Sequence, residues 1–148
     1  MSPVAIVTDS CASIPSPLIH ALNIRWVAYY IHRGREALRD LVTIQLDELL
    51  SWLPGAKELP TTASPGPGDY LTVYEDLIGR QECREIVSIH MTSAGSGAYQ
   101  AAKAAQSMAQ EKYPQARIEV IDTRNVSMCH GWMVIEAPGR RWSGSLTW

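Results

Sequence analysis

Short apolar runs alternate along the chain with stretches in which apolar residues recur at helical spacing. Four of the runs are rich in β-branched and aromatic residues, which is typical of buried strands. They span residues 4–7, 24–31, 85–91 and 118–121. The glycine-containing turn at residues 32–35 predicts that the chain then returns as a short edge strand.

The helical spacing lies between these runs. It predicts helices over residues 15–22, 43–53, 69–78 and 97–112, and the start of another over 129–136. The intervening segment 59–68 is rich in Pro, Gly, Ser and Thr and is predicted to be a loop. This alternation favours an α/β fold, a three-layer α/β/α sandwich with a mostly parallel sheet of about four or five strands.

The pattern ends before the chain does. We expect one domain over residues 1–136 and an atypical tail over 137–148. Pro138 and Gly139 stop the last predicted helix, and the sequence after them has little periodicity. We interpret the tail as a disordered segment, or as the product of a coding-frame error that replaces a natural continuation.

Composition narrows the class of protein. The 148 residues are 46% hydrophobic and 19% charged with a net charge of −2, which is ordinary for a globular domain. Without a basic patch interleaved with aromatics, nucleic acid is not an expected partner. No apolar run approaches the ~20 residues of a membrane span, and the N-terminus lacks the features of a signal peptide. Three scattered cysteines argue against a disulfide framework and for a reducing cytoplasm.

Polar clusters follow the predicted strands or lie beside them, at residues 8–10, 61–64, 92–97 and 122–123. Ligands of open parallel sheets bind beyond the carboxyl ends of the strands. The third cluster leads into a helix N-terminus, which attracts anions, and Gly95 and Gly97 let a backbone approach closely. We therefore predict a site for a small anionic group, a phosphate or a carboxylate. For any single cluster, helix capping is the alternative interpretation. No Lys follows Gly97, so the segment is not a P-loop.

Two residues after the first strand are candidates for catalysis. Asp9 is a candidate carboxylate, and Cys11 lies at a predicted helix start, where a thiolate is favoured. A capping aspartate and a packed cysteine are the simpler interpretations. The four histidines, His20, His32, His90 and His130, show no metal-ligand spacing, so no metal site is expected. We expect His90 to be a satisfied or surface residue of its strand.

Together these segments resemble the DegV family of bacterial fatty-acid-binding proteins. The family's strand followed by T-D-S and a helix is similar to VAIVTDSCASIP, and its P-T-T-S-Q-P loop and helix to LPTTASPGPGDYLTVYEDL. Its S-S-x-L-S-G-T-Y-Q-S-A segment is similar to MTSAGSGAYQAAKAA, and its V-I-D-S strand end to IEVIDTRNVSM. The resemblance covers residues 4–136 and rests on the order and spacing of these motifs.

The resemblance implies the fold of a DegV N-terminal domain and a binding role without catalysis, cofactor or metal. The implied ligand is one long-chain fatty acid, whose carboxylate is held by Thr62 and Ser93. Thr92 and Ser96 are close alternatives, and Ser10 or Asp9 would support them from behind. In some bacteria the family presents its fatty acid to a kinase subunit that makes an acyl phosphate, so such a subunit is an implied partner.

The sequence departs from the family pattern at several positions. Ala63 and Ser64 stand where the loop usually has Ser and Gln, and Gly95 and Ala98 replace the usual Leu and Thr. The family's C-terminal domain, which covers the acyl tail, is absent from this sequence, and a homo-oligomer is one way to cover the open face.

Two alternative functions stay open at this point. One is a phosphoryl- or acyl-transfer enzyme that uses Asp9, Cys11 and the glycine-rich turn. The other is a truncated fragment without activity of its own.

Overall fold

A parallel sheet forms the centre of the molecule. The computed structural model describes residues 4–139. The sheet has the strand order β2-β1-β6-β7, and all its neighbours pair in parallel. Its strands are β1 (Val4–Asp9), β2 (Arg25–Val27), β6 (Glu85–His90) and β7 (Arg117–Asp122). The predicted parallel sheet is confirmed, with four strands.

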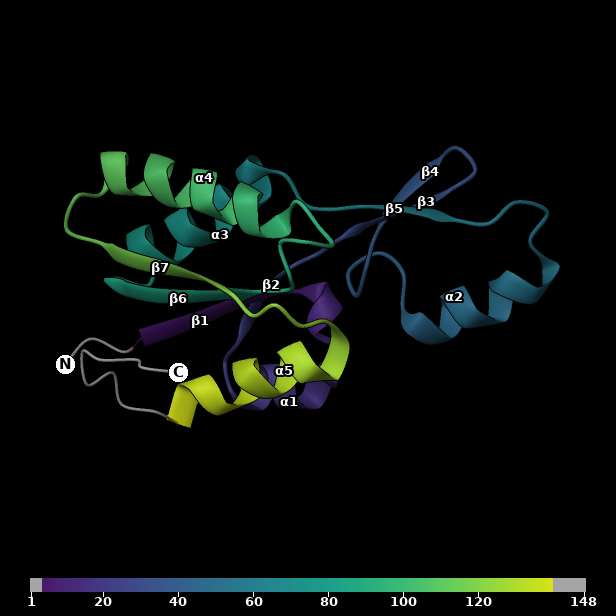
Figure 1. The fold of residues 1–148 in the computed structure, drawn as a ribbon, viewed down its shortest axis with the longest axis horizontal. Coiled ribbons are helices and arrows are strands. Elements are labelled where there is room, and N and C mark those ends of the chain that lie inside the picture. Colours follow the sequence, from purple (N-terminus) through teal and green to yellow (C-terminus); the bar gives the residue numbers. More distant parts are fainter. Residues whose placement is uncertain (1–3, 140–148) are drawn as a thin grey trace.

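Helices cover both faces of this sheet, so the predicted three-layer sandwich is also confirmed. In Figure 1, α3 (Pro67–Gly79) and α4 (Ala98–Lys112) lie on one face, and α1 (Ser16–Ala21) and α5 (Ser127–Glu136) on the other. The α4 helix turns five of its alanines inward (Ala98, Ala101, Ala102, Ala105 and Ala109), and because they are small its backbone packs close to its neighbours. Each face has its own core cluster of buried side chains.

A second, smaller unit stands beside the sandwich. Its antiparallel sheet has the order β4-β3-β5, from β4 (Glu36–Arg39), β3 (Tyr30–Arg33) and β5 (Thr61–Ala63). Figure 1 shows this sheet and α2 (Leu46–Trp52) projecting from one end of the parallel sheet. Gly34, at φ +60°, makes the predicted turn between β3 and β4. The α2 helix buries none of its residues, so its apolar stripe lies outside the two cores.

Two predictions about strands were wrong. The run 24–31 is not one strand, because the chain leaves the parallel sheet after Val27 and resumes as β3 at Tyr30. At this break the N–H of Tyr29 donates to Ser10 Oγ instead of to a neighbouring strand. The segment 59–68 is not entirely a loop, because Thr62 and its neighbours form β5 opposite β3.

Three single-turn 3₁₀ helices complete the described chain. They are η1 (Ser10–Ala12), η2 (Leu53–Gly55) and η3 (Ala137–Gly139). Of the predicted tail, residues 140–148 lie outside the described residues. Over residues 4–139, no helix is both long enough and apolar enough to cross a membrane.

Candidate functional site at the carboxyl edge of the sheet

The polar clusters that follow β1, β6 and β7 meet at one edge of the parallel sheet. In the strand register Thr8 lies opposite Ile89, and His90 lies opposite Asp122. The cluster after each strand therefore starts at nearly the same level. This places residues 9–11, 91–97 and 122–125 around one end of the sheet, as the sequence predicted for a parallel arrangement.

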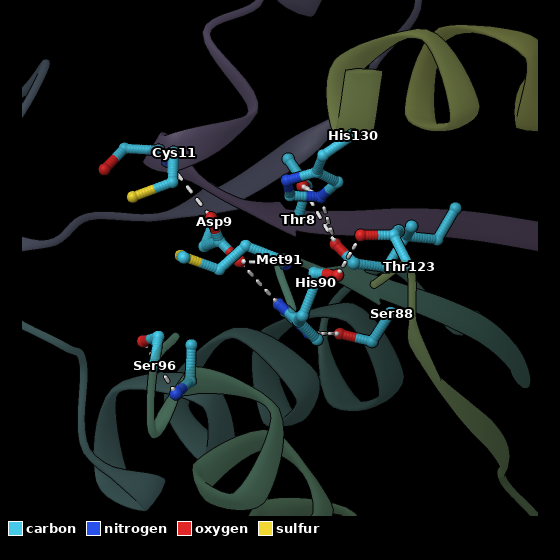
Figure 2. Close-up of polar contacts among 12 residues, drawn as sticks. Thr8, Asp9, Cys11, Ser88, His90, Met91, Ser96, Thr123 and His130 are labelled. Atoms are coloured by element: carbon cyan, nitrogen blue, oxygen red, sulfur yellow. Dashed lines mark hydrogen bonds and ion pairs between the residues drawn. The ribbon is translucent and has the colours of Figure 1, made fainter. Parts of the chain in front are cut away.

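Asp9 connects the ends of β1 and β6. Its Oδ1 accepts a hydrogen bond from the backbone N–H of Cys11 at 3.1 Å. Its Oδ2 accepts from the N–H of Met91 at 3.2 Å and from His90 Nδ1 at 3.1 Å. Asp9 and His90 are both fully buried. Figure 2 shows the carboxylate between these three partners. The predicted capping role of Asp9 is confirmed, since it caps η1, but its bond to His90 was not foreseen.

The hydrogen bonds continue from His90 into the core. His90 Nε2 lies 2.7 Å from Ser88 Oγ, and the Tyr74 hydroxyl donates to the same oxygen at 2.8 Å. Ser88 and His90 share one face of β6 because they alternate along the strand. An Asp–His–Ser order of this kind is also that of hydrolase triads, but here the serine is fully buried and already accepts from Tyr74. A substrate carbonyl does not reach it, so the arrangement is structural.

His130 anchors α5 to the sheet. Its Nε2 lies 3.0 Å from the carbonyl oxygen of Ile89 and 3.1 Å from Thr8 Oγ1. Thr8 Oγ1 itself donates to the same carbonyl, so it is available as an acceptor for the histidine N–H. Burial lowers the pKa of His130, which favours the neutral imidazole.

The segment 92–97 is a turn rich in hydroxyls that opens α4. Ser96 Oγ accepts from the N–H of Ala98 at 3.2 Å and lies 2.6 Å from the Tyr29 hydroxyl. Thr92 Oγ1 accepts from the N–H of Ala94 at 3.3 Å. Ser96 thus bonds the first N–H of α4, whose N-cap residue is Gly97 and has no side-chain capping bond, while Thr92 bonds within the turn itself.

Ser93 faces the end of β7. Its backbone N–H donates to Asp122 Oδ1 at 3.2 Å. Although burial acts to raise it, hydrogen bonds from the Ser93 side chain and from the N–H of Arg124 hold the pKa of Asp122 below its ordinary value. Asp122 is thus a loop-holding carboxylate, and it orients Ser93 within the turn.

Thr62 and Ser10 lie on different parts of the edge. Thr62 is exposed in β5, opposite Ile31 of β3. Just after β5, Ser64 lies against the start of α4, since a Cβ on Gly97 would stand 3.4 Å from Ser64 Oγ. The Pro-rich segment and the 92–97 turn are therefore neighbours in space. Ser10 is buried and accepts from the N–H of Tyr29 at 3.1 Å, so it fixes the crossover from β2 to β3.

Cys11 is not an activated thiol. Burial, followed by the neighbouring Asp9 charge, raises the pKa of Cys11 to about 12. This agrees with the simpler interpretation of a packed cysteine, since Cys11 packs against one of the core clusters, and desolvation and a nearby carboxylate oppose any effect of the short η1 helix on the thiol. A raised pKa disfavours the thiolate, which is the nucleophilic form of a cysteine. Within residues 4–139, no three His, Cys, Asp or Glu side chains gather closely enough to hold a metal ion.

Comparisons with known proteins agree with this architecture. The family model described as an uncharacterised protein of the DegV family matches residues 3–144. A DegV domain-containing protein of Caldanaerobacter subterraneus is 35% identical over 137 residues, which are 93% of this chain and 46% of the relative. One of Clostridium perfringens is 30% identical over 93% of this chain and 47% of its own.

Solved structures give the same result. A DegV family protein from Thermus thermophilus, described by its fatty acid binding, is 29% identical, with a TM-score of 0.78 over 94% of this chain and 47% of its own. DegV from Bacillus subtilis, described as a fatty acid binding protein, is 25% identical, with a TM-score of 0.84 over 94% and 47%. The chain spans about half the length of the relatives that it matches.

Proposed function

This chain belongs to the DegV family, and on that premise we propose that it binds the carboxylate of a long-chain fatty acid without catalysing a reaction. The observation that carries the proposal is the position of Ser64 beside Gly97, where an added Cβ would stand 3.4 Å from Ser64 Oγ. The Pro-rich segment therefore lies against the start of α4. Two hydroxyl-bearing segments thereby border one helix N-terminus. The solved relatives described as fatty-acid-binding proteins support the same ligand class.

The chemistry of the edge suits a carboxylate. An anion that leaves water needs hydrogen bonds to compensate its lost hydration. The first N–H groups of α4 and the positive end of its dipole supply part of this compensation. Thr62 adds a neutral donor. The Ser93 hydroxyl, which donates to Asp122 in the structure, adds a second when it turns from that carboxylate to the ligand. Thr92 and Ser96 are the other two hydroxyl-bearing residues of the 92–97 turn.

The acyl tail is the second half of the proposal. Each methylene that leaves water contributes about 0.8 kcal/mol, so tight binding requires an apolar cover for the tail. We place this cover in a further domain, of the kind that the twofold greater length of the relatives allows, or in a second copy of this chain. Presentation of the fatty acid to a kinase subunit, and action in the cytoplasm, belong to the same proposal.

The test combines lipid detection with paired variants. Native mass spectrometry of the purified protein is expected to show a co-purified fatty acid, and the delipidated protein is expected to take up oleate. Thr62→Ala and Ser93→Ala should each weaken oleate binding about tenfold, because each removes a hydrogen bond to a charged group.

Two matched controls use the same substitutions at exposed helix positions. Thr72→Ala and Ser107→Ala remove hydroxyls that bond only to their own helices, and both should bind oleate as the unaltered protein does. The absence of a co-purified lipid together with no uptake of oleate would overturn the proposed function.

A further inference from the structure

Asp9 holds the residue that leads into the proposed carboxylate site. Met91 directly precedes Thr92 and Ser93, and its N–H is bound by Asp9 Oδ2 at 3.2 Å. Asp9 reaches this N–H across the sheet from β1, a separation of 82 residues in the sequence. In Figure 2 dashed lines join Asp9 to both Met91 and His90.

Backbone hydrogen bonds hold the residues on either side of Met91, and Asp9 holds Met91 itself. The carbonyl of His90 accepts from both the N–H and the hydroxyl of Thr123, at 3.0 and 2.8 Å. The N–H of Thr92 donates to the carbonyl of Asn125 at 2.9 Å. These bonds tie the loop to the segment after β7. Between His90 and Thr92, the N–H of Met91 donates to Asp9, the last residue of β1.

A chain of directed hydrogen bonds fixes Asp9 in turn. Tyr74 donates to Ser88 Oγ, so the hydroxyl proton of Ser88 is available to His90 Nε2. His90 then carries its proton on Nδ1 and donates it to Asp9 Oδ2. This arrangement, assigned from the hydrogen-bond network, gives each of the four side chains a partner.

The geometry points to Asp9 and His90 as positioning residues of the fatty-acid carboxylate site. The buried chain from Tyr74 through Ser88 and His90 orients the Asp9 carboxylate, which fixes the Met91 N–H and with it the conformation of residues 92–97. This inference rests on the proposed function, because it names what shapes that site.

Two substitutions of His90 separate this role from general stability. In His90→Asn the amide nitrogen takes the place of Nδ1 and still donates to Asp9, whereas in His90→Gln it takes the place of Nε2 and leaves Asp9 without this donor. Positioning through Asp9 therefore predicts that His90→Asn retains the site and that His90→Gln and Asp9→Asn impair it. Ser107→Ala serves as the unaffected control.

Two measurements decide the question. Amide hydrogen exchange should show protection of the Met91 N–H falling about tenfold or more in His90→Gln and Asp9→Asn but staying close to the unaltered value in His90→Asn. Oleate affinity should fall by a similar factor in the first two variants, while affinity for oleyl alcohol, which carries no charge, should change less than about threefold. A loss of folded protein would weaken both ligands equally.

The outcomes are distinguishable. Unchanged protection of Met91 in His90→Gln, or equal loss in His90→Asn and His90→Gln, would overturn the positioning role whether or not a ligand binds. Failure of the unaltered protein to bind oleate would overturn the proposed function, while hydrogen exchange would still decide what holds the turn. If Asp9→Asn does not fold, the two His90 variants carry the test.

Discussion

Two tyrosines on neighbouring turns of α3 provide an internal comparison of hydrogen-bond energetics. Tyr70 and Tyr74 are both fully buried. Tyr74 donates to Ser88 at 2.8 Å, whereas the Tyr70 hydroxyl has no hydrogen-bond partner among the described residues. The Tyr70 ring instead packs edge-on against the ring of His90, with centroids 4.9 Å apart. The same Tyr→Phe change thus removes a satisfied hydroxyl at one position and an unsatisfied one at the other.

The two substitutions should change the free energy of unfolding differently. Tyr74→Phe loses a buried hydrogen bond and should lower this free energy by about 1 kcal/mol. Tyr70→Phe removes a polar atom whose burial costs about 1–3 kcal/mol when it is unpaired, so it should leave the free energy unchanged or raise it. The two variants should therefore differ by about 2 kcal/mol, or by about 4–8 °C in melting temperature for a domain of this size.

Urea denaturation of both variants, followed by far-UV circular dichroism, measures this difference. The slope of the free energy against urea should be equal in the two variants, since neither changes the exposed surface of the unfolded chain. If Tyr70→Phe is as destabilising as Tyr74→Phe, the Tyr70 hydroxyl has a partner and the contrast between the two positions is wrong.

Three further predictions follow from the packing around η1 and α5. Gly131→Ala should destabilise the protein by about 1–3 kcal/mol despite a better helix propensity, because its Cβ would stand 2.3 Å from the carbonyl oxygen of Ala12; a variant as stable as the unaltered protein in thermal denaturation would contradict this contact. In the folded protein an alkylating reagent should modify the exposed Cys129 before Cys11, whose pKa is raised to about 12 by burial and then by a nearby carboxylate; mass mapping that finds Cys11 modified first would refute this. Because burial lowers the pKa of His130 from its ordinary value of 6.5, the unfolded state binds the proton more readily, so stability should fall as pH drops below about 6.5. Replacement of His130 by Gln should flatten this dependence in denaturant titrations between about pH 7 and 5.

Much of the sandwich could be predicted because its elements have strong periodic signals. The run that became β1, residues 4–7, is apolar on both faces, as a strand covered by helices on both sides must be. The polar clusters at the carboxyl ends of β1, β6 and β7 could also be placed, because parallel strands bring these ends to one edge.

The small sheet gave no such signal. β5 consists of Thr61, Thr62 and Ala63, which are all exposed and are held through backbone pairing with β3. No alternation of apolar and polar residues marks a strand of this kind. The break between β2 and β3 was hidden for the opposite reason, since the residues of IRWVAYYI are almost all apolar and nothing in the pattern marks the point at which the chain changes sheets.

The hydrogen bond between Asp9 and His90 joins residues that are 81 positions apart, which no local pattern reports. One signal did exist. Ser88 and His90 alternate within a strand whose other buried residues are apolar, and a strand buried on both faces must provide partners for such side chains. Asp9 and Asp122, at the ends of the two neighbouring strands, were the acidic candidates.

Carbon-13 NMR of oleate labelled at its carboxyl carbon tests the central claim most directly, because it observes the group that the two segments are proposed to hold. We predict a separate resonance for the bound carboxylate in the unaltered protein, shifted or lost in both Thr62→Ala and Ser93→Ala and retained in Thr72→Ala and Ser107→Ala. A bound resonance that is identical in all four variants would show that the carboxylate lies elsewhere and would contradict the account.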